Sequence, residues 1–205
     1  PAIFLEKKLN APCLSRALSP VARGALGIAD RVRLRPSKKI EVVRAYSFDD
    51  TFDSLWKKRA DDFEIMIVRD STYLNWRYRQ NPIQEYVTYV GSRRKAPTGF
   101  VVLCSRIEEG VKRGYILELT SPQQDEELIE ALLCHSIFHF HREKTDVINI
   151  WLLEHSPAFE VAKKLGFILK ETPHDLIVRS HGKYENGYLS DRKRWFLTIG
   201  DSDYC

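Results

Sequence analysis

Residues 158–167 read Ala-Phe-Glu-Val-Ala-Lys-Lys-Leu-Gly-Phe, an amphipathic stretch that stops at a glycine and continues into apolar residues. Ser156-Pro157, just before it, supplies a capping side chain and a proline suited to the first helical position. Gly166 is where such a helix can end, because glycine tolerates the positive φ found there. The stretch therefore predicts a helix that stops at Gly166 and a strand over residues 167–170.

The residues before this stretch predict a sheet with a crossover helix. Residues 147–153 are nearly all apolar, which is typical of a central strand. Ahead of them, Ser121-Pro122-Gln123-Gln124 opens a long helix to about residue 144, with Ser121 as the cap and Gln124 completing a capping box. Three earlier runs of strand composition, separated by turn-like breaks, predict an antiparallel meander: residues 86–90, 99–107 and 114–120.

The outer parts of the chain complete the order. Residues 40–46 read as a strand, Ser47 reads as the cap of the next helix, and a second helix over about residues 70–80 ends at Asn81-Pro82. Residues 176–179 read as a closing strand, and residues 195–199 are a candidate for one more. The predicted order is β-α-α-β-β-β-α-β-α-β-β, a mixed α/β fold with a central, mostly antiparallel sheet and helices on both faces.

Charge is distributed unevenly along the 205 residues, whose net charge is +4. Residues 1–36 carry seven basic and two acidic side chains, whereas the rest carries 25 basic and 26 acidic ones. We therefore predict a basic helical linker or arm over residues 1–36 and one nearly neutral domain over residues 37–205. A membrane-surface amphipathic arm is the alternative, which its prolines and glycines disfavour. The near-neutral domain argues against a nucleic-acid binder.

The cellular setting is predicted from cysteines and apolar runs. Four cysteines without a CxxC pair, in a chain able to bury a sizeable core, indicate reduced thiols and a cytoplasmic protein. No apolar run reaches 18 residues, so no transmembrane segment is expected.

The element order and several motifs resemble the GNAT N-acetyltransferase superfamily. The stretch ending in Leu165-Gly166-Phe167 looks like the motif around that superfamily's fourth helix. Trp76-Arg77-Tyr78 followed by Asn81-Pro82, and the end of the chain over residues 195–203, resemble the carboxyl-terminal half of a bacterial group with two GNAT-like halves. The resemblance implies acetyl-CoA or another acyl-CoA as cofactor, a small amine acceptor such as an amino sugar, and an amino-terminal half as partner.

The cofactor motif of the superfamily is missing from its expected place. A glycine-rich turn there offers N–H groups to a pyrophosphate at a helix N-terminus. Here residues 119–128 contain no glycine, and Asp125, Glu126 and Glu127 add negative charge that would repel a diphosphate. Ala162 stands where the family often has a tyrosine acid, and His155 stands where it often has an asparagine.

The resemblance still assigns candidate site residues. Glu118 matches the place of a carboxylate base, although a structural role on a half-buried strand is the favoured alternative. Backbone and side chains over residues 119–124 would hold the cofactor: Leu119, Thr120, Ser121, Gln123 and Gln124. Trp76 and Tyr78 are candidates for an acceptor groove, with a core role as the alternative. No metal is expected, because His135 and His139 lack the Glu of an H-E-x-x-H motif.

Two functions follow from these observations. The first is an acyl-CoA-dependent N-acyltransferase domain in which Glu118 activates the amine. The second is a non-catalytic half that packs against an amino-terminal GNAT half and helps to shape the acceptor site. The missing glycines and Ala162 favour a cofactor-degenerate second half.

Overall fold

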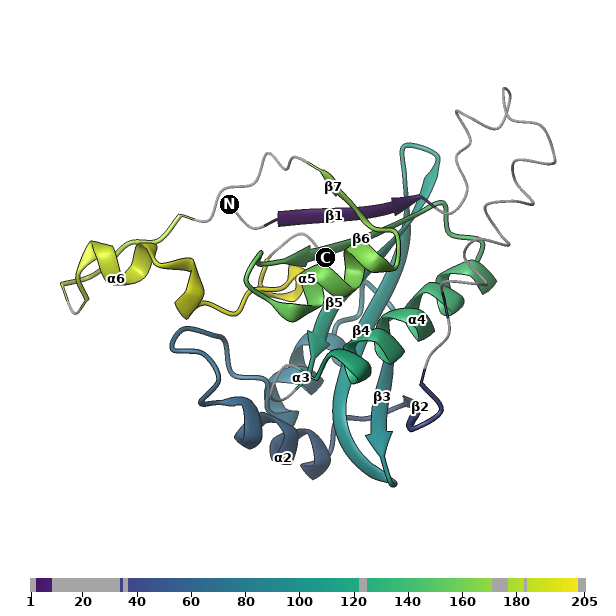
Figure 1. The fold of residues 1–205 in the computed structure, drawn as a ribbon, viewed down its shortest axis with the longest axis horizontal. Coiled ribbons are helices and arrows are strands. Elements are labelled where there is room, and N and C mark those ends of the chain that lie inside the picture. Colours follow the sequence, from purple (N-terminus) through teal and green to yellow (C-terminus); the bar gives the residue numbers. More distant parts are fainter. Residues whose placement is uncertain are drawn as a thin grey trace.

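The fold was analysed in a computed structural model that describes residues 3–8, 34, 37–121, 125–170, 177–182 and 184–202. A mixed sheet of seven strands crosses the molecule in the order β2-β3-β4-β5-β6-β1-β7 (Figure 1). Its strands are β1 (Ile3–Lys8), β2 (Ile40–Ala45), β3 (Val87–Arg93), β4 (Ala96–Glu108), β5 (Val111–Thr120), β6 (Val147–Leu152) and β7 (Ile168–Lys170). The helices are α2 (Asp50–Arg59), α3 (Ser71–Tyr78), α4 (Glu126–Arg142), α5 (Pro157–Lys164) and α6 (Asn186–Ser190), with short 3-10 turns at Arg192–Arg194 and Ile199–Asp201.

Two apolar cores lie on opposite faces of the sheet, because successive strand residues point to opposite sides. Val101 and Leu103 of β4 pack with α4 and α5, whereas Phe100, Val102 and Cys104 pack with α2 and α3. Helices therefore cover both faces, as the sequence predicts. The meander is also confirmed, since β2 to β5 are antiparallel neighbours and β6 adds parallel to β5.

Several predicted boundaries differ from the structure. The cap of α2 is Asp49, whose carboxylate accepts from the Thr51 N–H, so Ser47 lies outside the helix. Helix α4 begins after Asp125 and not at Ser121, because the Asp125 carboxylate accepts from the Leu128 N–H. Gly166 ends α5 with a φ of +88°, as its sequence predicts.

The strand predicted from residue 176 is absent among described residues 177–180, and residues 195–199 form only a single parallel bridge, between Trp195 and Ile65. The place beside β6 is taken by β1, which comes from the predicted basic arm. Of that arm the structure describes residues 3–8 and Leu34 alone.

Cys104 and Cys134 are buried free thiols. None of the described helices combines the length and hydropathy needed to cross a membrane.

Candidate functional site

A cleft opens where two parallel strands separate. β5 and β6 pair from Arg113–Val147 to Ile116–Ile150 and then diverge. A bulge in β5 precedes the divergence, because Leu103 pairs with Ile116 while Val102 pairs with Glu118, which leaves Leu117 as the extra residue. Bulges re-aim side chains, and Leu117 and Glu118 both face the α2–α3 side.

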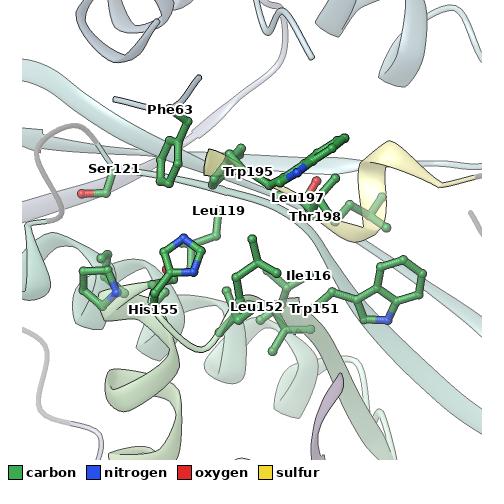
Figure 2. Close-up of a pocket in the computed structure, with 18 of the residues that line it drawn as sticks. Phe63, Ile116, Leu119, Ser121, Trp151, Leu152, His155, Trp195, Leu197 and Thr198 are labelled. Atoms are coloured by element: carbon green, nitrogen blue, oxygen red, sulfur yellow. The ribbon is translucent and has the colours of Figure 1, made fainter. Parts of the chain in front are cut away.

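The cleft between the separated strands is narrow. Leu119, Leu152 and His155 line it from the two strands and the following turn, and Phe63, Trp195 and Thr198 face them (Figure 2). The cavity has a volume of about 30 Å³. That volume admits a water molecule or two, whereas pockets for drug-sized ligands measure roughly 300–1,000 Å³.

Glu118 lies beneath the cleft wall in a buried polar network. Its side chain is 0% exposed and accepts from Arg69 Nε at 2.9 Å, from the Tyr78 hydroxyl at 2.8 Å and from Thr198 Oγ1 at 3.2 Å. Arg69 also donates to Asp201 at 2.6 Å, and its guanidinium lies over the Phe196 ring. Burial raises the pKa of Glu118, while the Arg69 charge opposes that shift. Of these partners Thr198 also lines the cleft, whereas Glu118 itself does not.

Arg59 supplies a second buried cation. It is 4% exposed, its guanidinium lies 4.3 Å from the Phe196 ring centroid, and it donates to the Ser121 carbonyl. Burial lowers its pKa to about 10, so it remains charged at neutral pH. Asp62, 3.6 Å away, is the ion-pair partner of Arg59, whereas Arg69 offsets the charges of Glu118 and Asp201.

The N-terminus of α4 is satisfied by the chain's own side chains. Asp125 caps the helix, and Arg93 binds both Asp125 at 2.8 Å and Glu127 at 2.7 Å. Ser37 donates to Glu127 at 2.5 Å, and this hydrogen bond together with Arg93 lowers the pKa of Glu127. Negative side chains therefore already occupy the helix end that would otherwise attract an anion.

This cap gives a direct stability test. Asp125→Ala is expected to lower the free energy of unfolding by about 1 kcal/mol, because the Leu128 N–H loses its acceptor. Urea unfolding at neutral pH measures the change. Glu126→Ala is the control, since Glu126 is 65% exposed and its ion pair with Lys164, at 3.8 Å, lies on the surface; we expect a change below about 0.5 kcal/mol. Equal losses in both variants would contradict the capping role.

The arrangement was compared with known proteins. No family model matches the sequence, and no curated protein matches it either. A GCN5-related N-acetyltransferase from Anabaena variabilis ATCC 29413 aligns with a TM-score of 0.57 at 8% identity, over 83% of this chain and 38% of that one. The chain has the GNAT fold. An aminoglycoside acetyltransferase from an uncultured soil metagenomic sample, solved with trehalose, aligns with a TM-score of 0.47 at 12% identity, over 73% of this chain and 99% of that one.

The GNAT fold would place acyl-CoA in the cleft, but the residues present do not fit it. The cleft has room for a water molecule or two, and Asp125 and Glu127 hold the helix end where a pyrophosphate would lie. Ala162 is fully buried in the core and donates nothing, and His155 lines the cleft beside Phe63, with ring centroids 6.3 Å apart.

The site residues predicted from the sequence do not come together at one place in the structure. Leu119 and Ser121 line the cleft, Thr120 is buried beside them, and Gln123 and Gln124 lie outside the described residues. Trp76 is 60% exposed on α3, next to Tyr73, whereas Tyr78 is 3% exposed and belongs to the Glu118 network. The structure therefore does not place Trp76 and Tyr78 in one groove.

Sequence reasoning did not single out four residues around Glu118 and the cleft. They are Arg59, Arg69, Thr198 and Asp201, which close the Glu118 network and the cleft.

His139 binds Tyr89 at 3.1 Å and Glu143 at 3.2 Å, and the described residues contain no group of three metal-ligating side chains.

Proposed function

We propose that this chain is the cofactor-degenerate half of a tandem GNAT acyltransferase, with a non-catalytic role beside an amino-terminal half that binds acyl-CoA. The α4 N-terminus carries the proposal, because the acids that cap it occupy the place of a phosphate-binding turn. The small volume of the cleft, about 30 Å³, supports it further.

The position of Glu118 supports the same role. A general base must reach the proton that it removes, directly or through one water molecule. The carboxylate oxygens of Glu118 instead accept hydrogen bonds from Arg69, Tyr78 and Thr198, and the side chain is fully buried. Under this proposal Glu118 anchors the carboxyl-terminal segment to the sheet and removes no proton from a substrate.

Titration with acetyl-CoA tests the proposal. We expect no saturable heat and no rise in melting temperature at 1 mM ligand. A site with a Kd near 10 µM would add about 2.7 kcal/mol at that concentration and raise the melting temperature by roughly 5–10 °C. An active GNAT acetyltransferase in the same buffer is the positive control. If this chain binds acetyl-CoA with a micromolar Kd, the proposal of a cofactor-degenerate half is wrong. Acyl transfer by this half would then be the better-supported function.

A further inference from the structure

Strand β1 is an interior strand of the sheet although it belongs to the start of the sequence. Six of its residues pair antiparallel with β6, from Ile3–Leu152 to Lys8–Val147. Its other edge pairs with β7, from Phe4–Lys170 to Glu6–Ile168. Figure 1 shows β1 in purple beside the green β6 and β7. β1 therefore bridges β6 and β7, which have no direct pairing with each other.

Two charged side chains fix the strand from opposite faces. Lys7 is 4% exposed, and its ammonium donates to the Leu165 carbonyl at 2.7 Å. Leu165 is the C-cap of α5, where a positive charge also favours the helix dipole. Glu6, also 4% exposed, binds Lys170 at 3.0 Å and lies 3.9 Å from Arg113.

The sheet neighbours of β1 lie far from it along the sequence. Between Lys8 and Leu34 lie 25 residues of sequence, so no tight turn joins β1 to a neighbouring strand. The register must then be set by the strand pairs and by the contacts of Glu6 and Lys7. A groove that recognises an extended segment in this way is a site for strand addition.

We propose that the groove between β6 and β7 is a strand-acceptor site, and that residues 3–8 occupy it by non-covalent contacts that survive cutting of the connection. The ligand class is an extended peptide with adjacent acidic and basic residues. The acidic side chain pairs with Lys170, and the basic side chain donates to the Leu165 carbonyl on the opposite face. On the proposed function, this site fixes a preceding half to the domain. The acceptor site itself can be tested independently of acetyl-CoA binding.

Cleavage of the full chain tests the proposal. A specific protease site is introduced within residues 15–25, the folded chain is cut, and the product is passed over a sizing column at 1 µM. We expect the amino-terminal fragment to elute with the body and to separate in urea. Separation of the two fragments in native buffer would overturn the proposal.

The role of Lys7 is tested in the cut protein by exchange against a labelled peptide of residues 1–10. Lys7→Ala should speed fragment release by about tenfold or more, because a buried hydrogen bond from a charged group is lost. Glu6→Gln, a milder variant, should speed it less. Lys57→Ala, on the exposed side of α2, is the matched control and should leave the rate unchanged. Release from the Lys7 variant at the control rate would overturn the proposal.

Discussion

Arg69→Met is expected to lower the free energy of unfolding by about 3–5 kcal/mol. Arg69 is 1% exposed and neutralises two carboxylates, Glu118 at 2.9 Å and Asp201 at 2.6 Å, which are themselves 0% and 6% exposed. Removing one member of a buried ion network leaves the others buried and unpaired, which costs more than the network contributes as a whole. Urea unfolding at pH 7 measures the loss.

A matched pair of variants separates the network from simple loss of charge. Arg192→Met removes an exposed arginine and should change the free energy of unfolding by less than about 0.5 kcal/mol. Arg69→Met combined with Glu118→Gln should recover part of the loss, because one of the two orphaned charges is gone and Asp201 remains. A loss below 1 kcal/mol for Arg69→Met alone would show that the network does not hold the fold.

The loss in Arg69→Met should also depend on pH. Burial raises the pKa of Glu118 above its ordinary value of 4.5, and removing Arg69 removes the main opposing influence. A carboxyl group with a raised pKa in the folded state stabilises that state below its unfolded pKa, and this contribution is lost as pH rises through the folded pKa. The gap between variant and parent should therefore be smaller at pH 4.5 than at pH 7.5.

The element order could be read from the sequence because it depends on local patterns. The apolar run at residues 147–152 and the helix stop at Gly166 appear where the sequence predicts them. Strand β1 could not be assigned, since Ile-Phe-Leu-Glu-Lys-Lys shows no clear alternation and its partners in β6 and β7 lie about 140 to 165 residues away along the chain. The sequence predicts a closing strand from residue 176 instead, which is absent among the described residues 177–180.

The candidate site was harder to predict, because burial of charge is a tertiary property. Arg69 precedes a helix and reads as an ordinary surface residue, yet its partners are 49 and 132 positions away in the sequence. Leu119 and Ser121, predicted to hold a cofactor, line the cleft, since both lie where β5 leaves its pairing with β6; their binding of a cofactor stays a prediction. The sequence left a groove role and a core role open for Trp76 and Tyr78, and the structure separates the two side chains, because Tyr78 is buried while Trp76 is exposed on another face of α3.

Gly200→Ala is the second variant with a large expected effect, a loss of at least about 2 kcal/mol. Gly200 lies in the turn Ile199–Asp201, over the Glu118 network. A Cβ atom there would overlap the Tyr78 hydroxyl and press on the Glu118 carboxylate, both held in a packed interior. Either the turn lifts, which weakens the bonds from Arg69 to Asp201, or Tyr78 moves and leaves Glu118 with fewer donors.

The two possibilities can be distinguished with a second substitution. Tyr78→Phe removes the overlapping oxygen, so Gly200→Ala should cost less in that background than in the parent, and the difference measures the coupling. Gly187→Ala in α6 is the control, because no atom lies within 4 Å of its added methyl group, and it should be neutral or slightly stabilising. If Gly200→Ala unfolds at the parent's urea midpoint, the carboxyl-terminal turn does not seal the network. In that case Glu118 becomes accessible from this side, and its role as a base has to be considered again.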